Sequence, residues 1–306
     1  MKRDTFLSEV SRHKFIYLLA LPGIVFFLVF SYLPMFGIVI AFKDFQMGKG
    51  ILGSPWNGFK NFEFFFSSGD AWKVTRNTIF LNSMFIVFIT FFQVFFAILL
   101  NEVRNSLFKR ITQSIMFLPY FMSWIIVSVI VMGFLGSDTG AVNKALNSLG
   151  HEGIAWFSSP KLWPAILVVL NAWKWSGYGV IIFLATIVGF DISFYEAAII
   201  DGAGKLQQIF HITLPLLKPT IIILTILAVG KIFYGDVGLI YGIIGDNAML
   251  FSTTDVIDTY VLRALRTSAD LGMSTAIGLW QSVMGFILVL ISNKLANKYE
   301  NEGALF

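Results

Sequence analysis

Six long apolar stretches dominate this sequence. They cover about residues 16–42, 77–100, 113–135, 163–189, 219–245 and 273–293 and together contain three formal charges, Lys174, Lys231 and Asp236. A helix crosses about 30 Å of hydrocarbon in roughly 20 residues, and backbone groups in lipid must be paired within the segment. We therefore predict an all-α polytopic membrane protein, in which residues 1–306 form one transmembrane domain with six transmembrane helices.

The composition agrees with this prediction and excludes several classes of protein. The chain is 57% hydrophobic and 13% charged, and its net charge of +4 comes from thinly spread basic residues, so we expect no nucleic-acid partner. The absence of cysteine excludes disulfide frameworks, zinc–thiolate sites and thiol nucleophiles. His13, His151 and His211 lie in different segments. We therefore expect no metal site and no catalytic constellation, and we predict that the chain is not an enzyme.

The distribution of basic residues predicts that both termini are cytoplasmic. In that orientation the inner segments 1–15, 101–112, 190–218 and 294–306 contain eleven Lys and Arg residues, and the longer outer segments contain nine. Cytoplasmic loops usually carry such an excess of positive charge. The apolar run after the basic N-terminus is too long for the h-region of a signal peptide, so we interpret it as an uncleaved first span.

The segment between the fourth and fifth apolar stretches, residues 193–216, is longer and more patterned than a connector needs to be. Ser193 stands three residues before Glu196, a capping-box pattern that predicts the start of a helix. Glycines around Gly202 predict a turn, and a second helical segment follows until Pro215 ends or kinks it. The sequence thus predicts a helix–turn–helix at the inner membrane face. The alternative is an amphipathic helix that lies in the membrane interface.

The motif EAAIIDGAGKLQQIFHITLP, residues 196–215, resembles the EAA loop of the membrane subunits of binding-protein-dependent ABC importers. The positions that match in residue type and spacing are Glu196, Ala197, Ala198, Asp201, Gly202, Ala203, Ile212, Leu214 and Pro215. Ile209 occupies the usual phenylalanine position, with Phe210 beside it. Other segments, including GSPWNGFKNF and FKRITQSIMFLPYFMSW, resemble the maltose-type carbohydrate-uptake permeases, in particular the branch associated with oligosaccharides from complex polysaccharides.

This resemblance implies a bacterial importer with several subunits. The EAA loop would be a coupling helix that docks on a cytoplasmic ATPase, so ATP and Mg would be bound by two partner ATPase subunits and this chain would bind no cofactor. DGAGKL also departs from a phosphate-binding loop, because Leu206 occupies the Ser/Thr position that would hold magnesium. A second homologous permease chain, an extracytoplasmic solute-binding protein and a multi-pass location in the cytoplasmic membrane are implied as well.

The charges inside the spans are candidates for a substrate path. A lysine at the centre of a membrane helix costs about 2.5–3.5 kcal/mol, so these charges should face the bundle interior or water. Aromatic residues beside them could stack on sugar rings. The full candidate set is Trp173, Lys174, Trp175, Tyr178, Lys231, Tyr234, Asp236 and Tyr241. The structural alternative is an ion pair between Asp236 and one of the lysines.

If the lysines face the substrate, we expect an oligosaccharide with acidic, uronate-like groups, because an ammonium pairs with a carboxylate. A break in the fifth span would fit such a site, since interrupted helices often bind substrate in transporters. The glycines that would permit this break are Gly230, Gly235, Gly238 and Gly242. The competing function is an ion-coupled secondary carrier, but the sequence shows neither an inverted repeat nor a chain of acidic residues.

Overall fold

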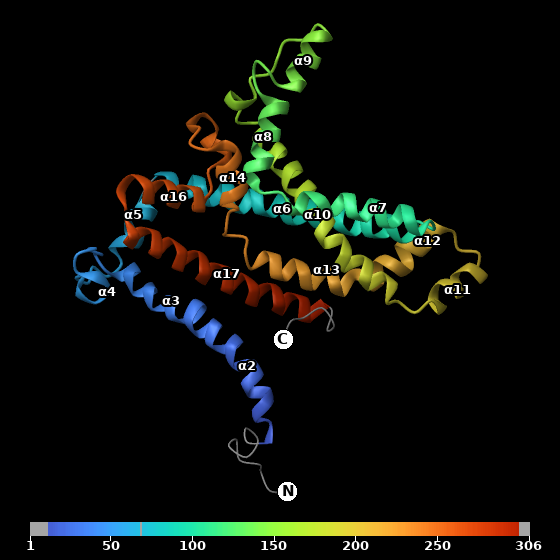
Figure 1. Ribbon diagram of the computed structural model, residues 1–306, viewed down its shortest axis with the longest axis horizontal. Helices are drawn as coiled ribbons and strands as arrows, with labels where there is room; N and C mark the ends of the chain where they lie inside the picture. The colour runs from blue at the N-terminus through green and yellow to red at the C-terminus, as the bar shows by residue number, and fades with distance from the viewer. Residues whose placement is uncertain (1–11, 68, 300–306) are drawn as a thin grey trace. The chain divides into compact units, whose positions relative to one another are not determined.

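The computed structural model describes residues 12–67 and 69–299 (Figure 1). Over these residues the chain consists of helices and irregular connections, with one isolated β-bridge between Lys43 and Trp56. Five helices are long and apolar enough to cross a membrane, and one bent helix pair brings the number to six if it counts as one span. The all-α fold class predicted from the sequence is confirmed.

The chain divides into two compact units, and the first comprises residues 1–67 and 264–280. Its long helix runs from Lys14 to Phe42. This helix is built from α2 (Lys14–Phe27), a π-helical turn (Leu28–Tyr32), α3 (Leu33–Met35) and a 3-10 segment (Phe36–Phe42). Pro34 follows the π-turn, and a widened turn is one way to absorb a proline that lacks an N–H group. The first predicted span, 16–42, coincides with this helix.

The loop after this helix is folded around polar groups. The Lys43 side chain is buried and donates to the carbonyls of Ile51 (2.7 Å) and Leu52 (3.1 Å). Asn61 donates to the carbonyls of Ala41 and Lys43, each at 2.9 Å. Two short helices, α4 (Gly50–Gly53) and α5 (Lys60–Ser67), complete the loop.

The second unit comprises residues 68–263 and 281–306. Its two longest complete helices are α6 (Gly69–Glu102) and α10 (Trp163–Val188), which pack side by side (Figure 1). A Cβ at Gly179 of α10 would overlap the side chain of Gln93 in α6, so the glycine is what allows this close approach. These helices coincide with the second and fourth predicted spans, although α6 begins eight residues before residue 77.

The remaining elements of this unit are shorter. They are α7 (Ser106–Phe117), η3 (Leu118–Phe121), α8 (Trp124–Leu135), α9 (Ala141–Ser148), η4 (Trp156–Ser158), α11 (Ser193–Ile200), α12 (Lys205–Gln208), η5 (Ile209–Thr213), α13 (Leu214–Val229), α14 (Val237–Ile244), η6 (Ala248–Leu250) and α15 (Phe251–Thr254). The helices α16 (Ile257–Ser268) and α17 (Leu271–Tyr299) belong partly to each unit, and α17 contains the sixth predicted span.

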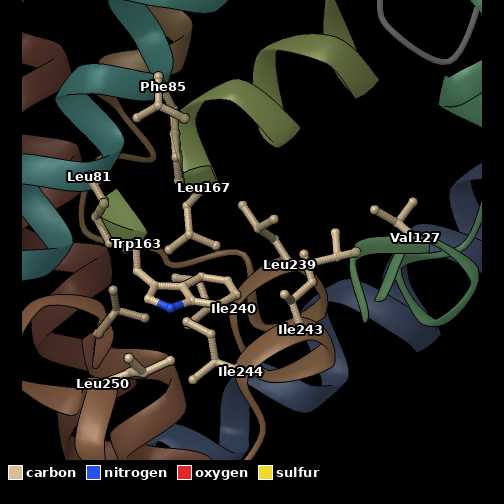
Figure 2. Packing of buried hydrophobic residues seen from close by; sticks show 13 residues of the cluster. Leu81, Phe85, Val127, Trp163, Leu167, Leu239, Ile240, Ile243, Ile244 and Leu250 are labelled. Atoms are coloured by element: carbon tan, nitrogen blue, oxygen red, sulfur yellow. The ribbon is translucent and has the colours of Figure 1, made fainter. Parts of the chain in front are cut away.

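An apolar core joins α6, α8, α10 and α14 (Figure 2). Trp163 and Leu167 of α10 face Leu239, Ile240 and Ile244 of α14, and all five side chains are buried. The Trp163 indole nitrogen donates to the carbonyl of residue 156 at 2.8 Å, so its polar atom is satisfied within this core. This packing fixes α14, which lies directly after an irregular segment of the chain.

The third span differs from the prediction. Residues 113–135 were expected to form one helix, but the helix Ser106–Phe121 and the helix Trp124–Leu135 meet at an angle of 100°. Met122 and Ser123 take extended backbone angles between them, and the Ser123 hydroxyl accepts from the Ile126 amide at 3.3 Å to start α8. Hydropathy could not reveal the bend, because the sequence is apolar on both sides of it.

The fifth span is not one helix over 219–245 but is interrupted, as its glycines would permit. The continuous helix runs from Lys205 to Val229, and α14 begins after an irregular segment, residues 230–236. Pro215 neither ends nor interrupts the helix. It lies in the first turn of α13, directly after the π-helical segment η5, where a missing amide hydrogen bond is tolerated.

Candidate functional site

The predicted helix–turn–helix between the fourth and fifth spans is present, but it is capped differently from the prediction. The Ser193–Glu196 capping box is wrong: α11 begins at Ser193, and no side chain caps it from Ile192. Instead the Asp191 carboxylate accepts from the Ser193 amide at 2.9 Å. This hydrogen bond holds the pKa of Asp191 below its usual range.

The turn of this loop is tightly specified. Gly202 has a φ of +78°, which disfavours every residue with a Cβ. The amide of Ala203 donates to the carbonyl of Ala198 at 2.8 Å. The Gly204 amide donates to the Gln207 side chain at 2.7 Å, and the buried Gln208 side chain donates back to the Ala203 carbonyl at 3.0 Å. These hydrogen bonds make the loop a rigid element rather than a flexible linker. We call the loop, residues 196–215, the knob.

Two contacts fix this knob to the helices beside it. The Tyr195 hydroxyl lies 3.0 Å from the Thr213 hydroxyl and connects α11 to η5. The Lys205 ammonium lies 3.0 Å from the Glu102 carboxylate and connects α12 to the end of α6. The sequence analysis missed Tyr195, Thr213 and Glu102 because their partners are distant in sequence or belong to another helix.

The knob presents a mixed surface to its surroundings. Glu196, Ala197, Asp201, Gly202, Phe210 and Pro215 are exposed, whereas Ala198, Ala203, Ile209 and Leu214 are partly buried. Its apolar side chains include Ile200, which is 86% exposed. A cavity of about 560 Å³ lies behind the knob, and Glu102, Tyr195 and Glu196 are among its lining residues.

Around the bend in the third span, the structure brings together part of the predicted substrate path. Lys174 is buried in α10, and its ammonium donates to the carbonyls of Pro119 (3.2 Å), Tyr120 (3.0 Å) and Met122. The Tyr120 ring stacks on the Tyr178 ring at a centroid distance of 4.8 Å. The Lys174 ammonium is thus hydrogen-bonded to backbone.

The aromatic neighbours of Lys174 lie on different faces of α10. Trp175 contacts Tyr120 edge-on at 5.4 Å. Trp173 lines an apolar cavity of about 400 Å³ together with Phe92 and Met116. Trp173 and Tyr178 are 42% and 44% exposed, so both rings keep free surface.

The other predicted path residues lie at the break in the fifth span. Lys231 is exposed there, and the Tyr234 hydroxyl lies 2.6 Å from the Ser282 hydroxyl. The Asp236 carboxylate accepts from the Trp124 indole at 3.0 Å and from the Leu239 amide at 2.9 Å. The Tyr241 hydroxyl donates to Asp246 at 3.2 Å.

The ion pair expected as the structural alternative for these charges is not formed among the described residues. Within residues 12–67 and 69–299, neither Lys174 nor Lys231 forms an ion pair with Asp236. Lys174 pairs with carbonyls and Asp236 caps α14, so each charge has found another structural partner.

Comparison with known proteins identifies the family. Residues 89–300 match the family described as binding-protein-dependent transport system inner membrane component. The chain belongs to this family. The permease is 40% identical over 302 residues to Protein LplB of Bacillus subtilis, which covers 99% of this chain and 94% of LplB. It is 37% identical, with the same coverage, to the polygalacturonan/rhamnogalacturonan transport system permease protein YteP of Bacillus subtilis.

Solved structures give the same result for the fold of the permease. A chain of a bacterial ABC transporter involved in the import of the acidic polysaccharide alginate superposes with a TM-score of 0.86 at 32% identity, covering 96% of this permease and 99% of that chain. A second structure, an alginate transporter in complex with an alginate pentasaccharide-bound periplasmic protein, gives a TM-score of 0.85 at 31% identity, covering 96% and 98%. The resemblance stated from the EAA motif is confirmed.

Several residues that contact the candidate substrate path were not predicted from the sequence. Tyr120 and Trp124 contact the predicted residues directly, and both lie in FLPYFMSW. Asn171, one turn before Lys174, is buried, and its side-chain oxygen has no hydrogen-bond partner within residues 12–67 and 69–299. The sequence does show this cluster of aromatic and polar residues inside an apolar span. It does not show the bend of the third span, which brings the cluster into contact with Lys174 and Asp236.

Proposed function

We propose that the permease is the membrane subunit of an ATP-driven importer for oligosaccharides that carry uronate groups. The observation that carries the proposal is Lys231, an exposed ammonium in the break between α13 and α14 with no ion pair among the residues described. A lysine at such a position is costly unless it meets water or an anion. The similarity to YteP and to the alginate transporter supports a carboxylate as that anion.

The sugar rings would contact the aromatic residues near the two breaks. Trp173 and Tyr178 keep part of their rings exposed, and Tyr120 stacks on Tyr178 to form an extended aromatic surface. Sugar rings pack their C–H faces on such surfaces while their hydroxyls find polar partners. In this proposal Lys231 binds the carboxylate of the substrate, and the aromatic residues stack on the sugar rings.

The proposal requires partners. Two ATPase subunits bind ATP and Mg, and one of them docks on the knob at Glu196–Pro215, so that a rigid loop transmits the movement of the ATPase to the spans. A second permease chain supplies the other coupling loop, an extracytoplasmic solute-binding protein delivers the sugar, and both termini of the permease face the cytoplasm. The stiffness of the turn at Gly202 supports this role.

The test compares Lys231→Gln with Lys231→Arg in proteoliposomes that contain the permease and its partner subunits. A charge-assisted hydrogen bond contributes about 1.5–3 kcal/mol, so Lys231→Gln should raise the KM for an oligogalacturonate at least about tenfold. Lys231→Arg should keep most of the affinity, and the methyl-esterified oligosaccharide should not distinguish the variants. Lys144→Gln, at an exposed position of α9, is the control. Equal uptake of both sugars by wild type and Lys231→Gln would refute the proposal.

A further inference from the structure

The bend in the third span is held by one side chain from α10. Lys174 is 5% exposed, and an ammonium has three N–H donors. All three find backbone carbonyls at the bend, those of Pro119, Tyr120 and Met122. Carbonyls at the end of a helix have no partner in the helix itself and need another donor when they are buried. The Pro119 carbonyl also accepts from the Met122 amide at 3.1 Å, so Lys174 supplies the missing donor chiefly to the carbonyls of Tyr120 and Met122 at the 100° bend.

A second contact extends from this lysine to the fifth span. The Trp124 ring, at the start of α8, lies 5.2 Å from the Lys174 ammonium. Its indole N–H donates to one oxygen of Asp236 at 3.0 Å, and the other oxygen of Asp236 accepts the Leu239 amide at 2.9 Å to start α14. A Cβ at position 238 would lie 2.6 Å from the Trp124 ring, so Gly238 makes room for the indole.

Side chains from α6 and α17 also donate hydrogen bonds to the backbone of the break in the fifth span. Asn82 of α6 donates to the carbonyls of Ile232 (2.9 Å) and Tyr234 (3.1 Å). Gln281 of α17 donates to the Phe233 carbonyl at 2.7 Å. Non-helical backbone at membrane depth is tolerated only where its polar groups are satisfied in this way. The break is thus a built element with a defined geometry.

We propose that Lys174, Trp124 and Asp236 form a positioning relay that locks the bend of the third span to the break of the fifth span. The relay makes the two interrupted spans move as one body when the coupling loop is displaced. Lys174 contacts backbone and Asp236 caps a helix, so both act through the elements they hold and neither contacts the sugar. This inference rests on the proposed function only where uptake of the oligosaccharide is the readout.

The first test uses Trp124→Phe, which keeps a ring over Lys174 and removes the N–H that reaches Asp236. In the reconstituted importer, this variant should lower the sugar imported per ATP hydrolysed about fivefold or more, with an unchanged KM for the sugar. Asp236→Asn should do the same, and the double variant should be no worse than either single variant, because both remove one link. Trp72→Phe, at a residue 75% exposed on α6, should leave the ratio unchanged.

The second test measures the link without using transport. The permease contains no cysteine, so spin labels can be placed at single engineered cysteines, for example at Val129 in α8 and Met249 after α14, both exposed. The distance distribution between the labels should be narrow in the wild-type importer and broader in Trp124→Phe. If Trp124→Phe does not assemble, Asp236→Asn is read in the same way.

The outcomes separate this inference from the proposed function. A raised KM in Lys231→Gln with intact coupling concerns the sugar site alone. Additive effects in the double variant, or an unchanged distance distribution together with an unchanged ratio of uptake to ATP hydrolysis, would overturn the relay even if the permease imports uronates.

Discussion

At the scale of the residue, Lys174 shows how a charge is kept inside an apolar protein without an opposite charge. Its ammonium is surrounded by carbonyl oxygens and by the face of Trp124, which are dipolar and quadrupolar partners rather than ions. This arrangement leaves the Asp236 carboxylate to cap a helix. One side chain therefore donates to three carbonyls at the bend.

Lys174→Met should be strongly destabilising. Removing the ammonium leaves the carbonyls of Tyr120 and Met122 without their donor, whereas the Pro119 carbonyl still accepts from the Met122 amide; at about 1–3 kcal/mol for each lost donor, we expect a loss of at least about 2 kcal/mol. Thermal unfolding of the purified permease in detergent measures the change, with Lys144→Met as the exposed control. A melting temperature equal to that of the control would show that the carbonyls do not depend on Lys174.

Asp258 predicts a specific dependence on pH. Burial raises the pKa of its carboxyl group, even though the carboxylate accepts from the Gly235 amide (2.5 Å) and from Gln281 (3.1 Å), and these hydrogen bonds lower the pKa. The folded state thus holds the proton more tightly than the unfolded chain. The free energy of unfolding therefore falls as pH rises from the ordinary carboxyl pKa through the raised one.

Asp258→Asn should remove this dependence, since the amide oxygen can still accept both hydrogen bonds. In acid we expect its melting temperature to equal that of the wild type. As pH rises from the ordinary carboxyl pKa to the raised pKa of Asp258, the difference in melting temperature in favour of the variant should grow, and at higher pH it should stay constant. Asp138→Asn, at an exposed position, should show no such trend. A constant difference between Asp258→Asn and wild type at every pH would contradict the argument.

At the scale of the element, the knob proposed to dock on the ATPase depends on one backbone conformation. The φ of +78° at Gly202 is strained for any side chain, and most of all for a β-branched one. Gly202→Val should therefore distort the knob and reduce coupling to the ATPase while the spans remain folded. Gly204→Ala is the matched control, because a Cβ there would make only an ordinary contact of 3.7 Å with Gln207.

The measurement for Gly202→Val is the ATPase activity stimulated by the loaded binding protein in the reconstituted importer. Strain in the left-handed region costs about 1–2 kcal/mol, so we expect a reduction of roughly fivefold to thirtyfold, and Gly204→Ala should stay near wild type. Equal activities of the two variants would mean that the turn is not a mechanical element.

Much of the element pattern was predictable from the sequence. The apolar runs at 16–42, 77–100, 163–189 and 273–293 correspond to continuous helices, because length and hydropathy alone decide such segments. The turn at Gly202 was predictable because the conformational freedom of glycine is a local property. The cap at Asp191 and the bend at Met122 were not, since a capping choice between two nearby acceptors and a turn inside an apolar run leave no hydropathy signal.

The candidate site was harder to predict than the fold. The sequence pointed to Lys174 and Asp236 as charges that need partners, and both do have partners. Which partners they take is decided by Trp124, which lies 50 residues before Lys174 and meets it only because the third span bends. Contacts of this kind depend on tertiary structure and cannot be derived from spacing.

At the scale of the whole molecule, the described residues form long helices whose surfaces are largely apolar and exposed. The helix Lys14–Phe42 shows this most clearly, with nearly all of its side chains exposed in the isolated chain. Exposed apolar surface of this extent requires lipid or another subunit. We expect the permease to purify with a second permease chain and an ATPase rather than alone, which size-exclusion chromatography with subunit identification measures. Recovery of a stable, transport-competent single chain would contradict this expectation.

The central claim is that force from a partner ATPase, transmitted through the knob at Gly202, drives uptake. The most direct measurement is uptake of a labelled oligogalacturonate into proteoliposomes that contain the full importer and its binding protein, with ionophores present to collapse all ion gradients. We expect uptake that requires ATP on the ATPase side, survives the ionophores and is reduced in Gly202→Val. Uptake that continues without ATP and disappears with the ion gradient would contradict it and would identify a secondary carrier.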